Sequence, residues 1–373
     1  MGLSLGLLLL VLQQPAVIVD GHIDTPQRML DMRTDISARL SDGHIDVPRM
    51  KEGGLTAAFF SIWVDARYLR DGAFRRALDL IAAVRALADT DPEVELVTTA
   101  DEVRSAAARG HVAALLGVEG GHAIENSLER LDSLYRLGVR YMTLTWNNGN
   151  DWAGASMDPR RSGGLSPFGR QVVRRMNELG MLVDVSHVSD ATFWDVIAVT
   201  TRPLIASHSA CRALARHPRN LSDAELRALA RNGGVVGINF YPVFLDDRFR
   251  REYERLRARL KPETDAIRAR YRDRPGESAF AVDQFVGQRV AAELAVPGIE
   301  RLVAHIDHAV QVMGVDHVGL GSDFDGISVL PAPMKDVTSL PLVVAALRAR
   351  GYSDDDVRKI LGENFLRVLS APR

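Results

Sequence analysis

The sequence predicts an α/β fold, a (β/α)8 barrel built as a single domain. Eight short apolar runs occur along the 373 residues, and each is followed by a polar or glycine-rich loop and then by a helical pattern. The runs are continuous rather than alternating, which is typical of parallel strands whose two faces are both covered by helices. Eight strands alternating with helices is the number in a (β/α)8 barrel, although a doubly wound open sheet would alternate in the same way.

The predicted strands follow one another in the order 16–20, 57–64, 113–119, 140–146, 181–187, 203–208, 234–240 and 317–323. Amphipathic segments predict helices between them at 75–88, 125–137, 166–179 and 222–232. Near the C-terminus, Ser353 precedes three aspartates. A serine cap and negative charge both stabilise the start of a helix, so a further helix is predicted there.

The segment 246–274 interrupts this alternation. It is densely charged with residues of both signs and shows little apolar periodicity. We interpret it as a solvated helical excursion in the seventh strand–helix connection, with a lid or a subunit contact as the alternative.

Residues 16–373 are predicted to form the barrel domain. Residues 1–15 contain an apolar run from Leu3 to Leu12, about half of the ~20 residues that span a bilayer, so no transmembrane span is expected. The run resembles part of a secretion signal but has no preceding Lys or Arg. A signal-peptide remnant and a flexible cytosolic start both remain open, and with them an exported or a cytoplasmic protein.

Charge and cysteine content narrow the classes of function. The net charge of -2 gives no electrostatic reason to expect nucleic acid or an anionic membrane as a partner. Cys211 is the single cysteine, which excludes an internal disulfide and a cysteine-based zinc site. A metal ion in this chain would therefore be held by histidines and carboxylates.

The motif His-x-Asp occurs twice, as His22–Asp24 in "DGHIDTP" and as His44–Asp46 in "DGHIDVP". Parallel α/β proteins place their chemistry at the carboxyl ends of the strands. The first copy directly follows the strand 16–20 and emerges at that end. The second copy precedes the strand 57–64 and approaches its amino end. We therefore expect the copies at opposite ends of the barrel, with only the first in the functional site.

Further metal-capable side chains end other predicted strands. Three imidazoles and three carboxylates are more than one tetrahedral zinc ion takes. They suit two divalent ions ~3.5–4 Å apart that share a carboxylate and a water, and such a water ionises near neutral pH and becomes a nucleophile. One catalytic ion with the remaining residues around it is the alternative. The six residues are His22, Asp24, Glu119, His187, His208 and Asp323.

Six motifs, taken in order, resemble the membrane (renal) dipeptidase family, a binuclear-zinc branch of the amidohydrolase-like barrels. The resemblance runs from about residue 17 to "GENFLRVL" near the C-terminus. It implies a metal-dependent dipeptidase with dipeptide substrates, and it leaves a homodimer open. The motifs are "DGHIDTP", "GVEGGHAI", "RYMTLTW", "VDVSHVSD", "IASHSACRALARHPRNLSD" and "GLGSDFDG".

By position, the resemblance implies two zinc ions per chain, with other divalent ions as alternatives. Glu119 matches the carboxylate that bridges them and would hold them at working distance. The first ion would be held by His22, Asp24 and Asp323, and the second by His187 and His208.

The resemblance also assigns catalytic and substrate-binding roles. Asp323 matches the residue proposed to pass a proton from the bridging water, whose hydroxide attacks the peptide carbonyl, to the leaving amine. Arg219 in "HPRN" matches an arginine that binds the terminal carboxylate of the substrate, whereas on the residues alone it would be a solvated loop arginine. Where the mammalian enzymes have a histidine after "TLT", this chain has Trp146 followed by Asn147. Stabilising the oxyanion would then fall to the second zinc, or to Trp146 or Asn147 as a hydrogen-bond donor.

Two other functions compete with the dipeptidase interpretation. A hydrolase of N-acyl amino acids or lactams would use the same metal residues on the same barrel. A binding or scaffold protein on an inactive barrel is disfavoured, because all six metal-capable positions are intact.

Overall fold

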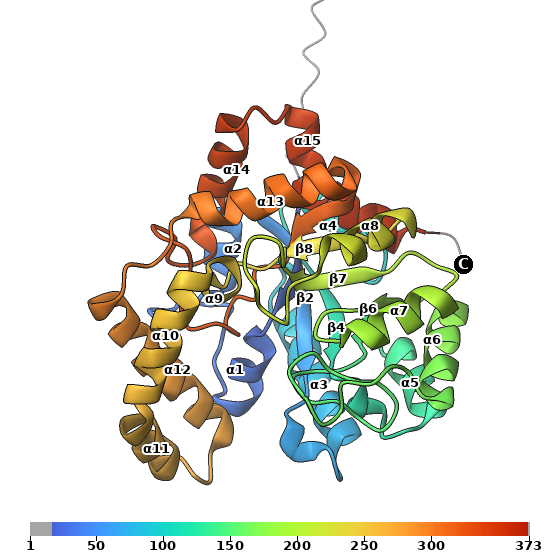
Figure 1. Ribbon diagram of the computed structural model, residues 1–373, viewed down its shortest axis with the longest axis horizontal. Helices are drawn as coiled ribbons and strands as arrows, with labels where there is room; N and C mark the ends of the chain where they lie inside the picture. The colour runs from blue at the N-terminus through green and yellow to red at the C-terminus, as the bar shows by residue number, and fades with distance from the viewer. Residues whose placement is uncertain (1–16, 372–373) are drawn as a thin grey trace, which may run out of the picture.

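A computed structural model describes residues 17–371, so both interpretations of residues 1–15 lie outside the described residues. Eight parallel strands close into a barrel surrounded by helices (Figure 1). The ring closes because β1 pairs with β9 as well as with β2, and β2 pairs with β4. The predicted (β/α)8 barrel is confirmed, and the open doubly wound sheet is excluded. The ring strands are β1 (Ile18–Ile23), β2 (Leu55–Trp63), β4 (Val112–Glu119), β5 (Val139–Thr143), β6 (Leu182–Asp184), β7 (Ile205–Ser209), β8 (Val235–Ile238) and β9 (Val318–Leu320).

A further strand, β3 (Val94–Leu96), lies outside the ring and pairs with the first residues of β4. The sequence did not predict it. Three residues are too few to show a period, and only Val94 is buried.

The amino ends of the barrel strands are closed by the C-terminal helix α16 (Asn364–Leu369). Its Phe365 packs inside the barrel, with its ring centroid 6.4 Å from that of Phe59. A Cβ atom at Gly319 would lie 2.6 Å from the Phe365 ring, so glycine at this position of β9 leaves space for the Phe365 side chain. Side chains of α16 and of the strands thus fill the amino end of the barrel.

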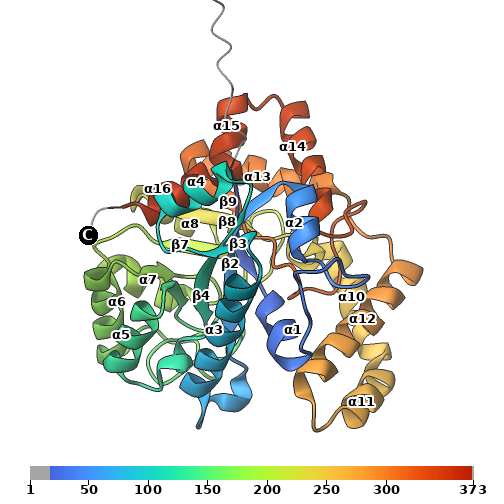
Figure 2. The same cartoon turned by 180° about the vertical axis from the view of Figure 1, so that it is seen from behind.

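The helices that follow the strands cover the outside of the barrel (Figures 1 and 2). The four predicted helices are confirmed as α3, α5, α6 and α8, and Ser353 caps α15 by accepting a hydrogen bond from the Asp356 N–H. Within residues 17–371, no helix is both long and apolar enough to cross a bilayer. The helices are α1 (Thr25–Asp31), α2 (Val47–Gly53), α3 (Ala73–Thr90), α4 (Ala100–Ala108), α5 (Leu128–Arg136), α6 (Pro167–Leu179), α7 (Asp190–Val199), α8 (Asp223–Arg231), α9 (Pro242–Leu245), α10 (Asp247–Arg259), α11 (Lys261–Arg270), α12 (Pro275–Glu293), α13 (Ile299–Met313), α14 (Leu340–Ala349), α15 (Asp354–Arg358) and α16.

The charged segment 246–274 forms α10 and α11, which lie beside α12 in the connection between β8 and α13 (Figure 1). The helices were predicted, but the interpretation as a merely solvated excursion is wrong. Phe249, Tyr253 and Leu256 are spaced by four and three residues, and they pack against valines of α12 in a separate apolar cluster. The many arginines and glutamates around these residues hid the apolar face from a reading of the sequence. Of this segment, Arg257 on α10 lines the cavity described below, and the alternatives of a lid and of a subunit contact stay predictions.

Candidate active site

The six metal-capable residues predicted from the sequence lie together at the carboxyl ends of the strands. His22, Glu119 and His208 belong to β1, β4 and β7, while Asp24, His187 and Asp323 lie in the loops that follow β1, β6 and β9. Two groups each have ligand atoms within 4.8 Å of one another. The first is His22, Asp24 and Asp323, and the second is His22, Glu119 and His208. His187 is in neither group, but its Nε2 is 2.8 Å from Oε1 of Glu119.

Glu119 lies at the centre of the cluster, with its two oxygens facing different imidazoles. Its Oε2 is 3.3 Å from Nε2 of His22, and its Oε1 is 2.8 Å from Nε2 of His187. Nε2 of His208 is 3.6 Å from the same Oε1 and 2.9 Å from Nε2 of His187. The two oxygens of this one carboxylate therefore face two different sets of imidazole nitrogens.

Two observations show that these residues fit divalent cations. Nε2 of His22 and Oδ1 of Asp24 are buried, and within the described residues neither has a hydrogen-bond partner. Burial, followed by the negative charge of Asp24, raises the pKa of Asp323 to about 7. Three carboxylates this close together repel one another unless cations lie between them, and imidazole with carboxylate is a donor set that zinc accepts.

The other ring nitrogen of each histidine is held by a partner that leaves Nε2 free. Nδ1 of His22 is 2.8 Å from the hydroxyl of Tyr141, and that hydroxyl donates to the carbonyl oxygen of Gly21. Tyr141 therefore accepts from Nδ1–H. Nδ1 of His187 is 3.1 Å from Oδ1 of Asn147, which is also an acceptor. Such partners fix the tautomer and the ring orientation of metal-binding histidines.

His208 is held in the same way through a relay of two groups. Its Nδ1 is 2.8 Å from Oγ of Ser207, which donates to Oδ2 of Asp184 at 2.6 Å. Burial, followed by the positive charges of His22 and Arg219, lowers the pKa of His208. The imidazole is therefore neutral, the form that binds a metal ion.

Sequence reasoning missed several residues that position the cluster. Asp184 also accepts from the hydroxyl of Thr143 at 2.5 Å, which ties β5, β6 and β7 together. Oδ1 of Asp20 accepts from the backbone N–H groups of His22 and Ser322, and Asn239 donates to Oδ2 of Asp323 at 3.0 Å. A signal was present in the sequence, because Asp20 and Asp184 are charged residues within otherwise apolar strands.

Two of the predicted strands that carry metal-capable residues end earlier than expected. His187 and Asp323 were placed at the ends of strands, but each lies three residues beyond, with φ angles of 70° and 65°. The backbone leaves the sheet because Oδ1 of Asp184 accepts from the N–H of Ser186, as Oδ1 of Asp20 does from Ser322. The resulting turns point the two side chains into the cluster.

The prediction that the two His-x-Asp copies lie at opposite ends of the barrel is wrong. Nδ1 of His44 accepts a hydrogen bond from the backbone N–H of Asp325, in the loop that carries Asp323, and His44 lines the same cavity as the cluster. The seven residues of α2 span about 10 Å and return the chain to the amino end of β2 only after the motif. His44 is in neither metal-capable group, and Asp46 caps α2 by accepting from the N–H of Arg49.

Arg219 is buried beside the cluster and is not the solvated loop residue that its local sequence indicates. Its side chain is 3% exposed, donates to the carbonyl oxygen of His208 at 3.0 Å and lies over the ring of Phe244. Burial lowers its pKa to about 10, although nearby Asp323 and Glu119 oppose this effect. Among the described residues it forms no ion pair, so its guanidinium is available to an anion in the cavity.

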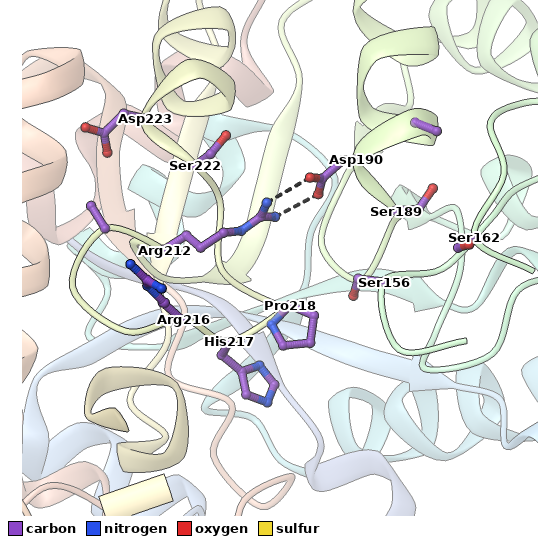
Figure 3. Close-up of a pocket in the computed structure, with 12 residues that line it drawn as sticks. Ser156, Ser162, Ser189, Asp190, Arg212, Arg216, His217, Pro218, Ser222 and Asp223 are labelled. Atoms are coloured by element: carbon purple, nitrogen blue, oxygen red, sulfur yellow. Dashed lines mark hydrogen bonds and ion pairs between the residues drawn. The ribbon is translucent and has the colours of Figure 1, made fainter. Parts of the chain in front are cut away.

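The loop that carries Arg219 is fixed from its outer side. Figure 3 shows Arg212 reaching across a cleft of about 760 Å³ to Asp190 at the start of α7, with hydrogen bonds of 2.7 and 2.8 Å. Arg212 also donates to the carbonyl oxygen of Asn220, next to Arg219. None of the six metal-capable residues lines this cleft. The hydrogen bonds of Arg212 to Asp190 and Asn220 hold this loop, and with it Arg219, in place.

The cluster opens into a larger cavity of about 780 Å³ at the mouth of the barrel. Trp146 lines it, and its ring meets that of Trp63 edge-on at a centroid distance of 5.0 Å. Asn147 lines it as well, while its Oδ1 is bonded to His187. Of the nine site residues predicted from the sequence, only the deeply buried His22 is absent from the wall. The other eight are Asp24, Glu119, Trp146, Asn147, His187, His208, Arg219 and Asp323.

Comparisons with known proteins agree with this geometry. The model of the membrane dipeptidase family (Peptidase family M19) matches residues 10–372. Dipeptidase verJ of Clonostachys rogersoniana is 32% identical over 376 residues, which cover 95% of this chain and 84% of that protein. A metallo peptidase from Rhodobacter sphaeroides, solved with a phosphinate mimic of the dipeptide L-Ala-D-Ala, is 28% identical with a TM-score of 0.77, covering 95% and 99% of the two chains. The probable dipeptidase PvdM from Pseudomonas aeruginosa is 28% identical with a TM-score of 0.79, covering 95% of each chain.

A closed parallel barrel with histidines and carboxylates gathered at its carboxyl ends defines a metal-dependent barrel hydrolase. The chain belongs to the membrane dipeptidase family, Peptidase family M19, and is a metallo-dipeptidase. The family resemblance drawn from the six motifs is thereby confirmed.

Proposed function

We propose that this dipeptidase holds two divalent cations, zinc by implication of the family, on the six clustered residues. The observation that carries the proposal is the position of Glu119, whose Oε2 faces His22 while its Oε1 faces His187 and His208. His22, Asp24 and Asp323 would hold one ion, and His187 and His208 the other. When bound, the ions would supply a shared water that ionises near neutral pH and a Lewis acid that polarises the peptide carbonyl.

Asp323 would move the proton during hydrolysis. The oxygen of water bonds to the peptide carbon, the C–N bond breaks, and the departing nitrogen needs a proton. Asp323 would take that proton from the water and deliver it to the nitrogen. Its Oδ2 is held by Asn239 at 3.0 Å, and a Cβ atom at Gly326 would come within 2.5 Å of its Oδ1. Glycine at position 326 therefore keeps space open beside this carboxyl group.

Arg219 would bind the C-terminal carboxylate of the dipeptide. A dipeptide differs from an internal stretch of protein in carrying both charged termini next to the scissile bond, so the enzyme needs a group that recognises one of them. The buried guanidinium of Arg219 has no carboxylate partner among the described residues, and a guanidinium can grip a carboxylate through two parallel hydrogen bonds.

The oxyanion that forms on the peptide carbonyl would receive hydrogen bonds from Asn147 or Trp146. Because Oδ1 of Asn147 accepts from His187, the amide group keeps its two N–H donors for another partner. Trp146 can donate only through its indole N–H. Of the two, Asn147 is the better placed, because its contact with His187 fixes the amide next to the cluster.

A turnover panel with added zinc tests the proposal. It comprises L,L and L,D dipeptides, the latter because the relative from Rhodobacter sphaeroides was solved with a mimic of L-Ala-D-Ala, together with N-acyl amino acids. We expect hydrolysis of dipeptides and about two ions per chain by elemental analysis. Faster turnover of N-acyl amino acids would favour the alternative hydrolase. A fully active protein with one ion per chain would overturn the bridging role of Glu119.

A further inference from the structure

A smaller pocket of about 390 Å³ lies beside the active-site cavity, between the loop after β2 and the helices α10, α11 and α12. We call this pocket the arginine annex, because Arg67, Arg257, Arg268 and Arg272 line it. Arg67 and Arg257 line the main cavity too. The two spaces therefore share part of their wall and lie side by side.

The guanidinium groups of the annex are not all neutralised by the protein. Arg67 pairs with Asp65 at 2.9 Å and Arg268 with Asp265 at 3.1 Å. Arg257 contacts the hydroxyl of Tyr253 at 3.4 Å, and neither it nor Arg272 forms an ion pair within residues 17–371. By contrast, two other arginines on the cavity wall, Arg28 and Arg76, are paired with aspartates at 2.5 and 2.6 Å.

One carboxylate, that of Asp283, belongs to the annex wall. Burial raises its pKa to about 6, and the positive charges of Arg257 and Arg268 only partly oppose this effect. An anion beside Asp283 would raise that pKa further, so the carboxyl group can take up a proton rather than repel the ligand. The annex remains cationic, and a carboxylate suits its guanidinium groups.

The barrel topology indicates which end of the substrate reaches the annex. Arg219 follows β7, whereas Arg67 follows β2, and these strands lie on opposite sides of the eight-stranded ring. The metal-capable cluster lies between them. A dipeptide whose C-terminal carboxylate binds Arg219 therefore extends its N-terminal residue toward the annex.

We propose that the arginine annex binds the acidic side chain of the N-terminal residue, so that the enzyme prefers dipeptides beginning with glutamate or aspartate. This inference rests on the dipeptidase activity proposed above. It makes Arg257 and Arg272 determinants of specificity, without a part in the bond-breaking step.

The test compares kcat/KM for Glu-Ala and its neutral isostere Gln-Ala, with Ala-Glu and Ala-Gln as the reversed pair and Ala-Ala as the reference. We expect wild type to prefer Glu-Ala over Gln-Ala by roughly 10-fold or more, the range of a charged hydrogen bond, and to show a smaller ratio for the reversed pair. The double variant Arg257→Gln/Arg272→Gln should bring the first ratio close to one, and Arg257→Lys/Arg272→Lys should restore part of it.

A matched control removes one charge from the same helical segment outside the annex. Arg248 lies on α10, is 83% exposed and pairs with Glu252, so Arg248→Gln should keep the wild-type ratio. An equal loss of preference in Arg248→Gln would show a general charge effect and overturn the annex. Equal cleavage of Glu-Ala and Gln-Ala by wild type, or a preference confined to Ala-Glu, would also overturn it. In each of these three cases, hydrolysis of Ala-Ala would still support the dipeptidase proposal. If no dipeptide were cleaved, the dipeptidase proposal itself would be refuted.

Discussion

The hydroxyl of Tyr141 lies 2.8 Å from Nδ1 of His22 and donates its own proton to the carbonyl oxygen of Gly21. This geometry requires the proton of the His22 ring to be on Nδ1, so that the lone pair of Nε2 faces Asp24 and Glu119. A tyrosine in the barrel interior thus sets the tautomer of a proposed metal ligand on a different strand.

Replacing Tyr141 with Phe should weaken metal binding about 10- to 100-fold, because the partner that orients His22 is lost while the ring still fills the core. Competition with a chelator of known affinity measures this change. Tyr352→Phe is the control, since that hydroxyl bonds Asp307 on the outside of the barrel. Unchanged affinity in Tyr141→Phe would show that the hydroxyl does not orient the ligand.

The duplicated motif gives a second prediction. His22→Ala should lose bound metal and activity, because Nε2 of His22 is part of both metal-capable groups. His44→Ala should retain the metal, because Nδ1 of His44 accepts from the backbone N–H of Asp325 and not from the cluster. Elemental analysis of the two purified variants decides the matter, and metal loss in His44→Ala alone would reverse the assignment.

Glu119→Ala should reduce the content of both ions, because its two oxygens face different imidazoles. Asp24→Ala is the comparison, since Asp24 is in only one of the two metal-capable groups and should affect mainly one ion. Metal content and kcat measured in parallel test this difference. If Glu119→Ala still bound one ion as tightly as wild type, the carboxylate would not bridge.

Arg219→Ala should lower kcat/KM on a dipeptide by about 10- to 150-fold, which corresponds to the roughly 1.5–3 kcal/mol of a charged hydrogen bond. Arg219→Lys should recover only part, because an ammonium group cannot form the two parallel bonds. A dipeptide with an amidated C-terminus should be a poor substrate for wild type, and Arg219→Ala should harm its cleavage little further. Equal cleavage of free and amidated dipeptides by wild type would remove Arg219 from substrate recognition.

Stability should fall in acid partly because of His305, which lies away from the cluster. Its Nδ1 accepts from the N–H of Cys211 and its Nε2 donates to Leu245, so the folded protein holds the ring neutral. Burial lowers its pKa to about 4, against an ordinary value of 6.5. Between these values the unfolded chain binds a proton that the folded chain does not. The contribution of His305 to the free energy of unfolding is therefore fully present above pH 6.5. It decreases as the pH falls toward 4, by about 3 kcal/mol.

His305→Gln removes the titration while keeping one acceptor and one donor. Urea unfolding at several pH values should show a smaller decrease between pH 7 and pH 4 in the variant than in wild type. The free energy of unfolding is plotted against pH for both proteins. The difference between the two slopes gives the contribution of His305 separately from those of the other buried histidines. Parallel slopes would mean that His305 does not contribute.

Much of the barrel could be predicted because its strands are buried on both faces and therefore read as apolar runs. The same reasoning failed for β3, which is too short, and for the apolar face of α10, which arginines and glutamates flank. It also placed His44 at the wrong end of the barrel, because strand order alone does not reveal that α2 lies between the motif and β2.

The sequence by itself predicted eight strands alternating with helices, the membrane dipeptidase family and the six metal-capable residues, because these follow from local patterns and from motifs in a fixed order. The pairing of β1 with both β9 and β2 decided that the strands close into a barrel. Only the tertiary structure decided what surrounds those residues. The contacts of Tyr141 with His22 and of Asp184 with Ser207 join different strands, and the burial of Arg219 and the shared wall of the arginine annex join different loops. Burial, tautomer and charge pairing depend on neighbours far away in the chain, and no short stretch of sequence carries that information.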